Sequence, residues 1–279
     1  RFTDKDRDLY FQLSEREYAI ASERRGAAGV YFVLLLGYFR AKNQFFDVAA
    51  ETSQEDVRYI VGRHFPAIRE RLLVPPSRPT LQSLQDDVLE VLGFRRWAGM
   101  RSVLVRRLKE LAMRSTLPRY LVREAISFLE RERIALPAYS HLQDLIGAVV
   151  TCETERLTRM LKDAMPAKVR KQLDALTQPD GSAYRITMLK QDLRDFTYKA
   201  LRTEVERRKI FAPLHAFATT FLARAAISTD SSKYYSSLVM YYTTTKLQRM
   251  APLQAKLYLL CFCYHRYRQV NDHLVEAFV

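Results

Sequence analysis

Cysteine, glycine and proline are scarce in this sequence: three, eight and ten occur among 279 residues. The cysteines, Cys152, Cys261 and Cys263, form no Cys-x-x-Cys pair, and the five histidines show no metal-ligand spacing. This pattern argues against a structural zinc site and indicates a reducing, intracellular setting. The scarcity of glycine and proline argues against an architecture of short strands and tight turns. We therefore expect long regular elements.

A membrane-spanning run is missing as well. The longest apolar run, from Gly26 to Phe39, has 14 residues, which is short of the roughly 20 that cross a bilayer. Basic residues flank it on both sides. The run therefore predicts a buried helix, and we expect no membrane partner.

Catalytic motifs are also lacking. The sequence has no glycine-rich phosphate loop, no nucleophile elbow, no His-Glu-x-x-His and no acidic set placed on strands to clamp two metals. It therefore predicts neither an active site nor a cofactor in this chain. Tyr241 or Tyr242 could be the nucleophile of a recombinase, but no Arg and His set can be assembled around them. At helical spacing, these tyrosines are more typical of core and interface positions.

What the sequence does have is positive charge. Lys and Arg number 45 against 31 Asp and Glu, a net charge of +14. The excess is +1 over residues 1–97, +5 over 98–181 and +8 over 182–279. Each phosphate that Lys or Arg neutralises releases condensed counterions, so such a chain favours a polyanionic partner. DNA or RNA is the first candidate and an anionic membrane surface the second.

Apolar residues follow helical spacing nearly throughout, and no run alternates as strands do. Capping boxes at Thr52–Glu55 and Ser140–Gln143 predict two helix starts, and Pro213 and Pro252 are placed in first helical turns. The prolines of 75–79 predict a rigid joint, and residues 177–182 a domain boundary. We therefore expect an all-α, multi-domain protein with domains at 1–97, 98–181 and 182–279.

Residues 118–151 have the pattern of a helix-turn-helix. An amphipathic segment from Arg119 to Glu132 precedes a Leu-Pro turn and a helix from His141. If the second helix enters the major groove, His141, Gln143, Asp144 and Gly147 face outward. The core would receive Leu142, Leu145, Ile146 and Val149. The alternative is an ordinary helical hairpin in which Ser140 and Gln143 only cap.

A similar unit is possible earlier in the chain. The helix over 26–39 leads through Gln44 and two phenylalanines into a helix over 53–65, whose outward face would show Gln54, Arg58, Tyr59 and Arg63. The alternative is a solvated face in which Glu55 pairs with Arg58.

Basic residues cluster close to aromatics at five places, where phosphate contacts are their natural use. A single basic cluster is more often only solvated surface, so the joint excess of basic over acidic residues is the stronger indication. The clusters are Arg24 with Arg25, Arg40 with Lys42, Arg95 with Arg96, Arg101 with Arg106 and Arg107, and Arg266 with Arg268.

Five segments, in order and spacing, resemble the amino-terminal portion of replicative transposases of the Tn-three family. They are SERRGAAGVYFVLLLGYFRAKNQFF (22–46), EDVRYIVGRHF (55–65), LQDDVLEVLGFRRW (84–97), ERERIALPAYSHLQDLI (130–146) and RMAPLQAKLYLLCFCYHRYRQVNDHLVEAF (249–278). The resemblance implies that the first two domains bind terminal inverted repeats. A third region would serve dimerisation and further DNA contact. A carboxy-terminal RNase H-like domain with an Asp-Asp-Glu set would follow, and no segment of this sequence matches it.

The resemblance implies DNA contacts in both units. They fall at Arg24, Arg25, Arg40, Lys42 and Gln44, and at Arg106, Arg107, Ser140, His141 and Gln143. The basic clusters add Arg95, Arg96, Arg101, Arg266 and Arg268, and the outward face of the helix over 53–65 adds Arg58. We expect a fragment, starting at Arg1, that binds double-stranded transposon ends without catalysis at the bacterial nucleoid and that can pair as a homodimer. The alternative is a helical scaffold in which Tyr234–Leu247 packs against a partner protein.

Overall fold

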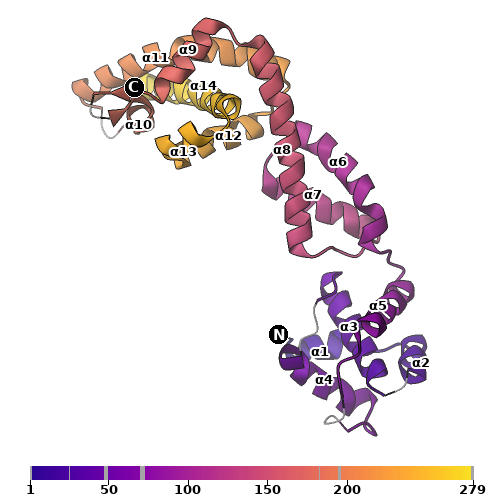
Figure 1. Ribbon diagram of the computed structural model, residues 1–279. Coiled ribbons are helices and arrows are strands. Elements are labelled where there is room, and N and C mark those ends of the chain that lie inside the picture. The colour runs from indigo at the N-terminus through magenta and orange to yellow at the C-terminus, as the bar shows by residue number, and fades with distance from the viewer. Residues whose placement is uncertain are drawn as a thin grey trace. The chain divides into compact units, whose positions relative to one another are not determined.

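The computed structural model describes residues 2–24, 26–46, 50–69, 73–181, 183–193 and 196–277. Within these ranges the chain is 77% helical, with 14 α-helices and one two-stranded hairpin, which confirms the expected all-α class (Figure 1). The elements are α1 (Asp4–Tyr10), α2 (Glu15–Glu23), α3 (Ala27–Lys42), α4 (Ala50–His64), α5 (Arg78–Leu92), η2 (Trp97–Met100), α6 (Arg101–Arg114), α7 (Pro118–Arg131), α8 (Tyr139–Ala164), α9 (Ala167–Leu176), β1 (Pro179–Asp180), β2 (Ala183–Tyr184), α10 (Arg185–Leu189), α11 (Tyr198–Arg224), α12 (Thr229–Tyr241), α13 (Thr244–Arg249) and α14 (Pro252–Glu276).

The chain divides into two units. Unit 1 comprises residues 1–105 and 123–144, and unit 2 comprises 106–122 and 145–279. The boundaries therefore fall inside α6, α7 and α8. The division into three domains at 97 and 181 stays a prediction.

Unit 1 is built around α3, which packs against α1, α2, α4 and α5 (Figure 1). Ten of its 16 residues are buried, which confirms the predicted buried helix. Two glycines allow this burial, because a Cβ at Gly29 would collide with the carbonyl of Ala21 and one at Gly37 with the ring of Phe11. The helix runs past Phe39 to Lys42, and Asn43 after it caps the helix in the left-handed conformation.

Three of the four predicted helix starts are wrong. Helix α4 begins at Ala50 and α8 at Tyr139, so Thr52 and Ser140 lie inside the first turns rather than capping them. At α8, the carbonyl of Ala138 accepts the Leu142 N–H at 3.2 Å, so the helix starts directly after the Pro137 break. Pro213 lies inside α11, where Phe211 and Leu214 are buried on either side of it. Pro252 does begin α14, as predicted.

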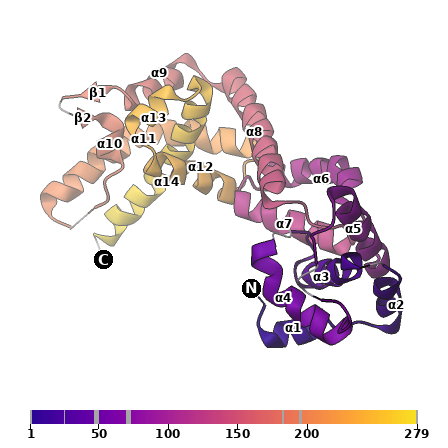
Figure 2. The same cartoon turned by 60° about the horizontal axis from the view of Figure 1, so that its bottom comes forward.

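Unit 2 is built around α14, which packs on α11, α12 and α9 (Figure 1). Leu257 to Cys263 form an unbroken buried run along it. The predicted boundary at 177–182 lies within this unit. Gly181, with φ +66°, turns the chain between β1 and β2, and Pro179 pairs with Tyr184 beside α10 (Figure 2).

Across the described ranges, no helix is both long and apolar enough to span a membrane.

Candidate functional site

Three helices of unit 1 end in the same way. Helix α3 is followed by Asn43 (φ 50°), α5 by Gly93 (φ 68°) and α7 by Arg133 (φ 50°), all in the left-handed region. Each of these residues turns the chain into an extended segment. The segments pair in parallel, Gln44 with Leu136 and Arg95 with Ile134. We call residues 43–45, 93–96 and 133–137 the junction.

Backbone hydrogen bonds fix the turn before α8 to the junction. The N–H of Arg95 donates to the Arg133 carbonyl at 2.8 Å, and the N–H of Ala135 donates back to Arg95 at 3.0 Å. The N–H of Leu136 donates to the Asn43 carbonyl at 2.7 Å. The start of α8 is thus positioned by two other parts of unit 1 rather than by its own turn alone.

Two residues that were predicted to contact DNA take part in the junction. Gln44 Nε2 donates to the Pro137 carbonyl at 3.0 Å, and an Arg95 guanidinium nitrogen donates to the Glu132 carbonyl at 3.0 Å. Gln44 is half-buried and its donor is committed to the turn. Arg95 keeps a side chain that is 58% exposed.

The first turn of α8 is open to solvent on one side. Ser140, His141 and Gln143 are exposed, and Tyr139 is 70% exposed. The opposite face is buried as predicted, at Leu142, Leu145, Ile146 and Val149. The predicted split between an outward polar face and an inward apolar face is therefore confirmed, whereas the helix-turn-helix interpretation stays a prediction.

The other predicted arginines of unit 1 mostly bind within the fold. Arg24 pairs with Asp87 at 2.5 Å, and Arg96 donates to Asp86 and to the Gln82 carbonyl. Lys42, Arg58 and Arg101 are exposed on the surface. Arg25 lies outside the described residues.

Arg40, another residue predicted to contact DNA, holds contacts within unit 1. Its guanidinium donates to the carbonyls of Tyr10 and Gln12, at 3.2 and 2.6 Å, and to Glu17 at 2.6 Å. Burial raises the pKa of Glu17, but hydrogen bonds from the Ser14 backbone, from Arg40 and from the Ser14 hydroxyl outweigh it and lower that pKa overall. Arg40 thus ties α3 to the α1–α2 connection.

In unit 2 the residues predicted to contact DNA differ in their exposure. Arg106 and Arg107 are exposed on α6, and Arg107 faces Glu110 at 3.3 Å. Arg268 is exposed on α14. Arg266, two residues earlier, is only 3% exposed, which overturns its expected place on the surface. It donates to the Asp192 carboxylate, at 2.6 Å, and to the Gln191 carbonyl.

An aromatic stack with an arginine at each end joins α11 to α14 in unit 2. The ring of His215 lies parallel to Tyr264 at 5.1 Å and is tilted against Tyr267 at 4.3 Å. Arg268 covers Tyr264 and Arg208 covers Tyr267, each at 5.8 Å. Burial, and then the charge of Arg268, lower the pKa of His215, which keeps its imidazole neutral for stacking.

Sequence reasoning missed this stack. His215 and Arg208 lie about 50 residues or more before their partners, and nothing in the spacing of lone polar residues connects them. Only the antiparallel packing of α11 on α14 brings them together.

Tyr241 and Tyr242, the candidate recombinase nucleophiles, and the nearby Tyr235 lie in different environments. Tyr235 is fully buried and stacks on Tyr258 at 5.0 Å, as expected for a core residue. Tyr241 is 85% exposed. The Tyr242 carbonyl accepts a hydrogen bond from Lys190 Nζ at 2.5 Å. No cluster that could hold a metal ion occurs within the described ranges.

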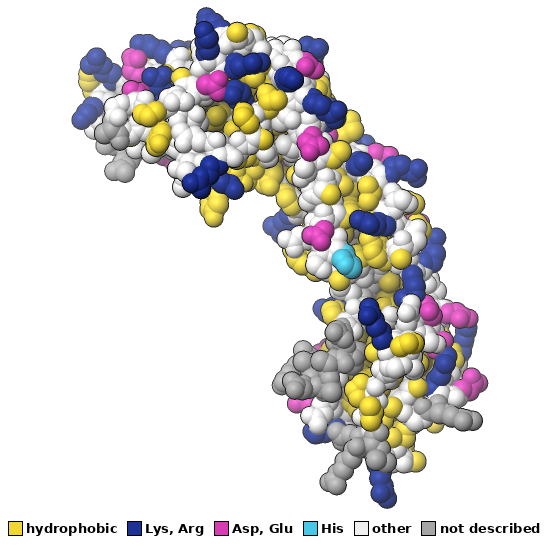
Figure 3. Space-filling model, viewed as in Figure 1, with side chains coloured by type: hydrophobic (Ala, Val, Ile, Leu, Met, Phe, Trp, Pro, Cys, Tyr) yellow, Lys and Arg dark blue, Asp and Glu magenta, His cyan; other side chains and the backbone are white. Residues whose placement is uncertain are grey.

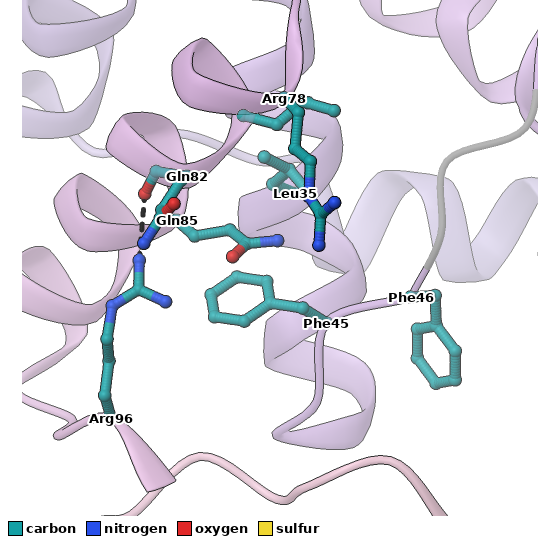
Figure 4. A pocket seen from close by; sticks show the side chains of 8 residues that line it. Leu35, Phe45, Phe46, Arg78, Gln82, Gln85 and Arg96 are labelled. Carbon is teal, nitrogen blue, oxygen red and sulfur yellow. Dashed lines mark hydrogen bonds between the residues drawn. The ribbon is translucent and has the colours of Figure 1, made fainter. Parts of the chain in front are cut away.

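Unit 1 also contains a cavity of about 710 Å³ between α3, α5 and the segment after α3, which we call the α3–α5 cavity (Figure 4). It is lined by Leu35, Phe45, Phe46, Arg78, Leu81, Gln82, Gln85 and Arg96. Figure 4 shows the Arg78 guanidinium and the Gln85 carboxamide converging above the Phe45 ring. Its lining thus combines aromatic, amide and cationic groups.

The family described as Domain of unknown function (DUF4158) matches residues 1–149, which is more than half of the chain. No curated protein matches the sequence significantly. The matched range contains the junction, the α3–α5 cavity and the first turn of α8.

Proposed function

Because the chain belongs to the DUF4158 family, and its matched range includes four of the five segments that resemble Tn-three transposases, we propose that it binds transposon ends. In this proposal it is the amino-terminal part of a replicative transposase and recognises the double-stranded terminal inverted repeats. Its task is binding rather than catalysis.

The first turn of α8 carries the proposal. Ser140, His141 and Gln143 are exposed side chains that can donate to and accept from base edges, and the junction holds the turn before them in place. A rigidly positioned helix start is what a protein needs to bring a few side chains into a groove in one register.

Unit 2 supplies the sequence-independent part of the affinity in this proposal. Arg106, Arg114 and Arg119 are exposed and have no ion pair within the described residues. Figure 3 shows Lys and Arg side chains standing out over the unit 2 surface, with fewer acids among them. Such cations fit phosphates, and two linked binding surfaces on one chain raise the affinity of both.

Selection from a randomised duplex pool at about 150 mM salt tests the proposal. We expect one sequence motif to be enriched, and that motif to occur at the ends of the element that encodes the chain. Binding that prefers no sequence would contradict it.

A variant series locates the reading residues. Ser140→Ala, His141→Ala and Gln143→Ala should each relax selection at one or two adjacent positions, because removing a base contact costs about 1–3 kcal/mol. Thr151→Ala, an exposed change further along the same helix, is the matched control and should leave the motif unchanged.

A helical scaffold remains the second candidate, favoured by one observation. Tyr241 and Met240 are adjacent and are 85% and 41% exposed. Exposed apolar side chains of this size are typical of protein interfaces. A scaffold whose charge serves only solubility would elute early from heparin, with no salt-dependent retention.

A further inference from the structure

The α3–α5 cavity contains polar groups that the fold does not use. Neither the Gln82 nor the Gln85 carboxamide has a hydrogen-bond partner within the described residues, and Arg78 has no ion pair there. Gln85 is partly buried, whereas Arg78 and Gln82 are exposed. Because none of the three side chains holds a contact of this kind in the described part of the fold, all of them can bind a molecule in the cavity without breaking one.

One aromatic ring provides a surface on which a planar group can stack. The ring of Phe45 packs against Phe39, with centroids 4.8 Å apart, and this contact holds it in place. Leu35, which also lines the cavity, is 1% exposed, so part of the lining is a buried apolar side chain. Gln85 and Arg78 approach from α5, above the ring (Figure 4).

Arg96 closes the rim of the cavity. Its guanidinium donates to the Asp86 carboxylate and, at 2.9 Å, to the Gln82 carbonyl. Because both bonds lie within α5 and the segment after it, Arg96 is largely occupied. The cation available to a ligand is therefore Arg78.

An aromatic ring, a carboxamide and a guanidinium are complementary to the three parts of a nucleotide. A base stacks on phenylalanine, a glutamine amide pairs with a base edge such as that of adenine, and arginine binds phosphate. The volume of about 710 Å³ lies within the range of about 300–1,000 Å³ usual for small-ligand sites. We propose that the α3–α5 cavity binds one nucleoside monophosphate unit.

The source of that unit rests on the proposed function. If the chain binds transposon ends, an unpaired nucleotide of the bound DNA can enter the cavity. A free nucleotide presents the same chemistry, so the experiment has one arm for each source.

The first arm titrates the full chain with adenosine 5′-monophosphate by isothermal calorimetry. Saturable binding is expected, with a Kd on the order of 0.1 mM. Arg78→Ala and Gln85→Ala should each weaken it by about tenfold. Arg69→Ala and Ser83→Ala, exposed changes outside the cavity, are the matched controls and should bind as the unchanged chain does.

Two outcomes of this arm overturn the free-nucleotide source. Inorganic phosphate could bind as tightly as the nucleotide, which would make the cavity a phosphate site. Alternatively, Arg78→Ala and Gln85→Ala could leave the nucleotide affinity unchanged, which would place binding elsewhere.

The second arm uses duplex DNA with a single-stranded overhang that contains 2-aminopurine, whose fluorescence reports stacking. The unchanged chain should alter this fluorescence, and Arg78→Ala should abolish the change while duplex affinity falls less than about threefold. If neither AMP nor the overhang responds, the cavity binds no nucleotide. Failure of the proposed function would differ, because duplex selection would then enrich no motif whatever the cavity does.

Discussion

Unit 1 and unit 2 use their charged side chains differently. Unit 1 has 19 Lys and Arg against 18 Asp and Glu, a net +1, whereas unit 2 has 26 against 13, a net +13. In unit 1, Arg24, Arg40 and Arg63 each pair with a carboxylate from a distant part of the chain. In unit 2, several exposed cations have no ion pair with any described residue. Positive charge is thus largely paired within the fold in unit 1, whereas unit 2 keeps a surplus of it on its surface.

This difference shows that a basic cluster in the sequence does not by itself identify an interface. Arg40 and Arg106 are both arginines in basic clusters, and the sequence does not distinguish them. The first has three hydrogen bonds inside unit 1, and the second is exposed on a helix surface without an ion pair in the described part of the chain. Surplus charge after internal pairing is therefore the better guide to a polyanion site.

The largest effect on stability is expected at Arg266, which is a buried cation in the unit whose cations are mostly exposed. Replacing Arg266 with Ala removes a buried cation that bonds Asp192 and Gln191, and it should lower the free energy of unfolding by about 3–5 kcal/mol. Arg268→Ala is the matched control, since the exposed Arg268 should contribute less than about 0.5 kcal/mol. Urea unfolding measures both. Equal effects would remove the distinction between structural and surface arginines in α14.

The next effect compares the free cations of unit 2 with the paired ones of unit 1. Joint replacement of Arg106, Arg114 and Arg119 with Ala should lower DNA affinity about 10- to 100-fold and flatten the slope of log K against log salt by about 0.9 for each phosphate no longer neutralised. Fluorescence anisotropy over a salt series measures it. Arg24→Ala with Arg63→Ala should hardly change the slope. If this unit 1 pair flattened the slope as much, the comparison between the units would fail.

Part of this arrangement could be predicted from the sequence. The apolar run in α3 and the apolar face of α8 follow from local spacing, and both are buried as expected. Hydrogen-bond partners could not be predicted in the same way. Gln44 bonds Pro137, 93 residues away, and Arg266 bonds Asp192, 74 residues away. A contact between positions so distant depends on packing, which no local pattern encodes.

The α3–α5 cavity could not be predicted from local sequence patterns either. Its lining residues come from α3, the segment after α3, α5 and the segment after α5. Phe45 and Arg96 are visible in the sequence only as part of an aromatic pair and a basic pair. Their convergence results from the junction, whose three left-handed residues turn three helices into paired segments.

A smaller effect concerns pH and compares His265 with Glu17. Burial, and then the charges of Arg268 and Lys233, lower the pKa of His265 from 6.5 to about 4. The unfolded chain therefore takes up this proton first, and stability is complete above pH 6.5 and lost as pH falls towards 4. His265→Gln should remove about 1–2 kcal/mol of this loss in unit 2.

The stability contribution of Glu17 changes with pH in a more acidic range. Its lowered pKa means that its contribution is present above 4.5 and is lost as pH falls further, so Glu17→Gln should affect unit 1 only in acid. Hydrogen exchange of peptides from each unit, followed over pH, separates the two. If the His265→Gln variant lost stability between pH 6.5 and 4 as the unchanged chain does, the loss would not come from His265.

The smallest effect tests whether the junction depends on its left-handed residues. Gly93 has φ +68°, and a Cβ there would also meet the Arg133 guanidinium at 3.4 Å, so Gly93→Ala should destabilise unit 1 by about 1 kcal/mol. Gly62, in α4 of the same unit, has open space around it, so Gly62→Ala should instead stabilise by about 0.5–1 kcal/mol through helix propensity. Thermal unfolding measures both changes in stability.

The Gly93→Ala variant should also relax base selection by α8. Gly93 lies two residues before Arg95, whose backbone hydrogen bonds hold residues 133–135. A Gly93→Ala variant that unfolds more easily yet selects the same motif would show that the junction stabilises unit 1 without positioning the helix.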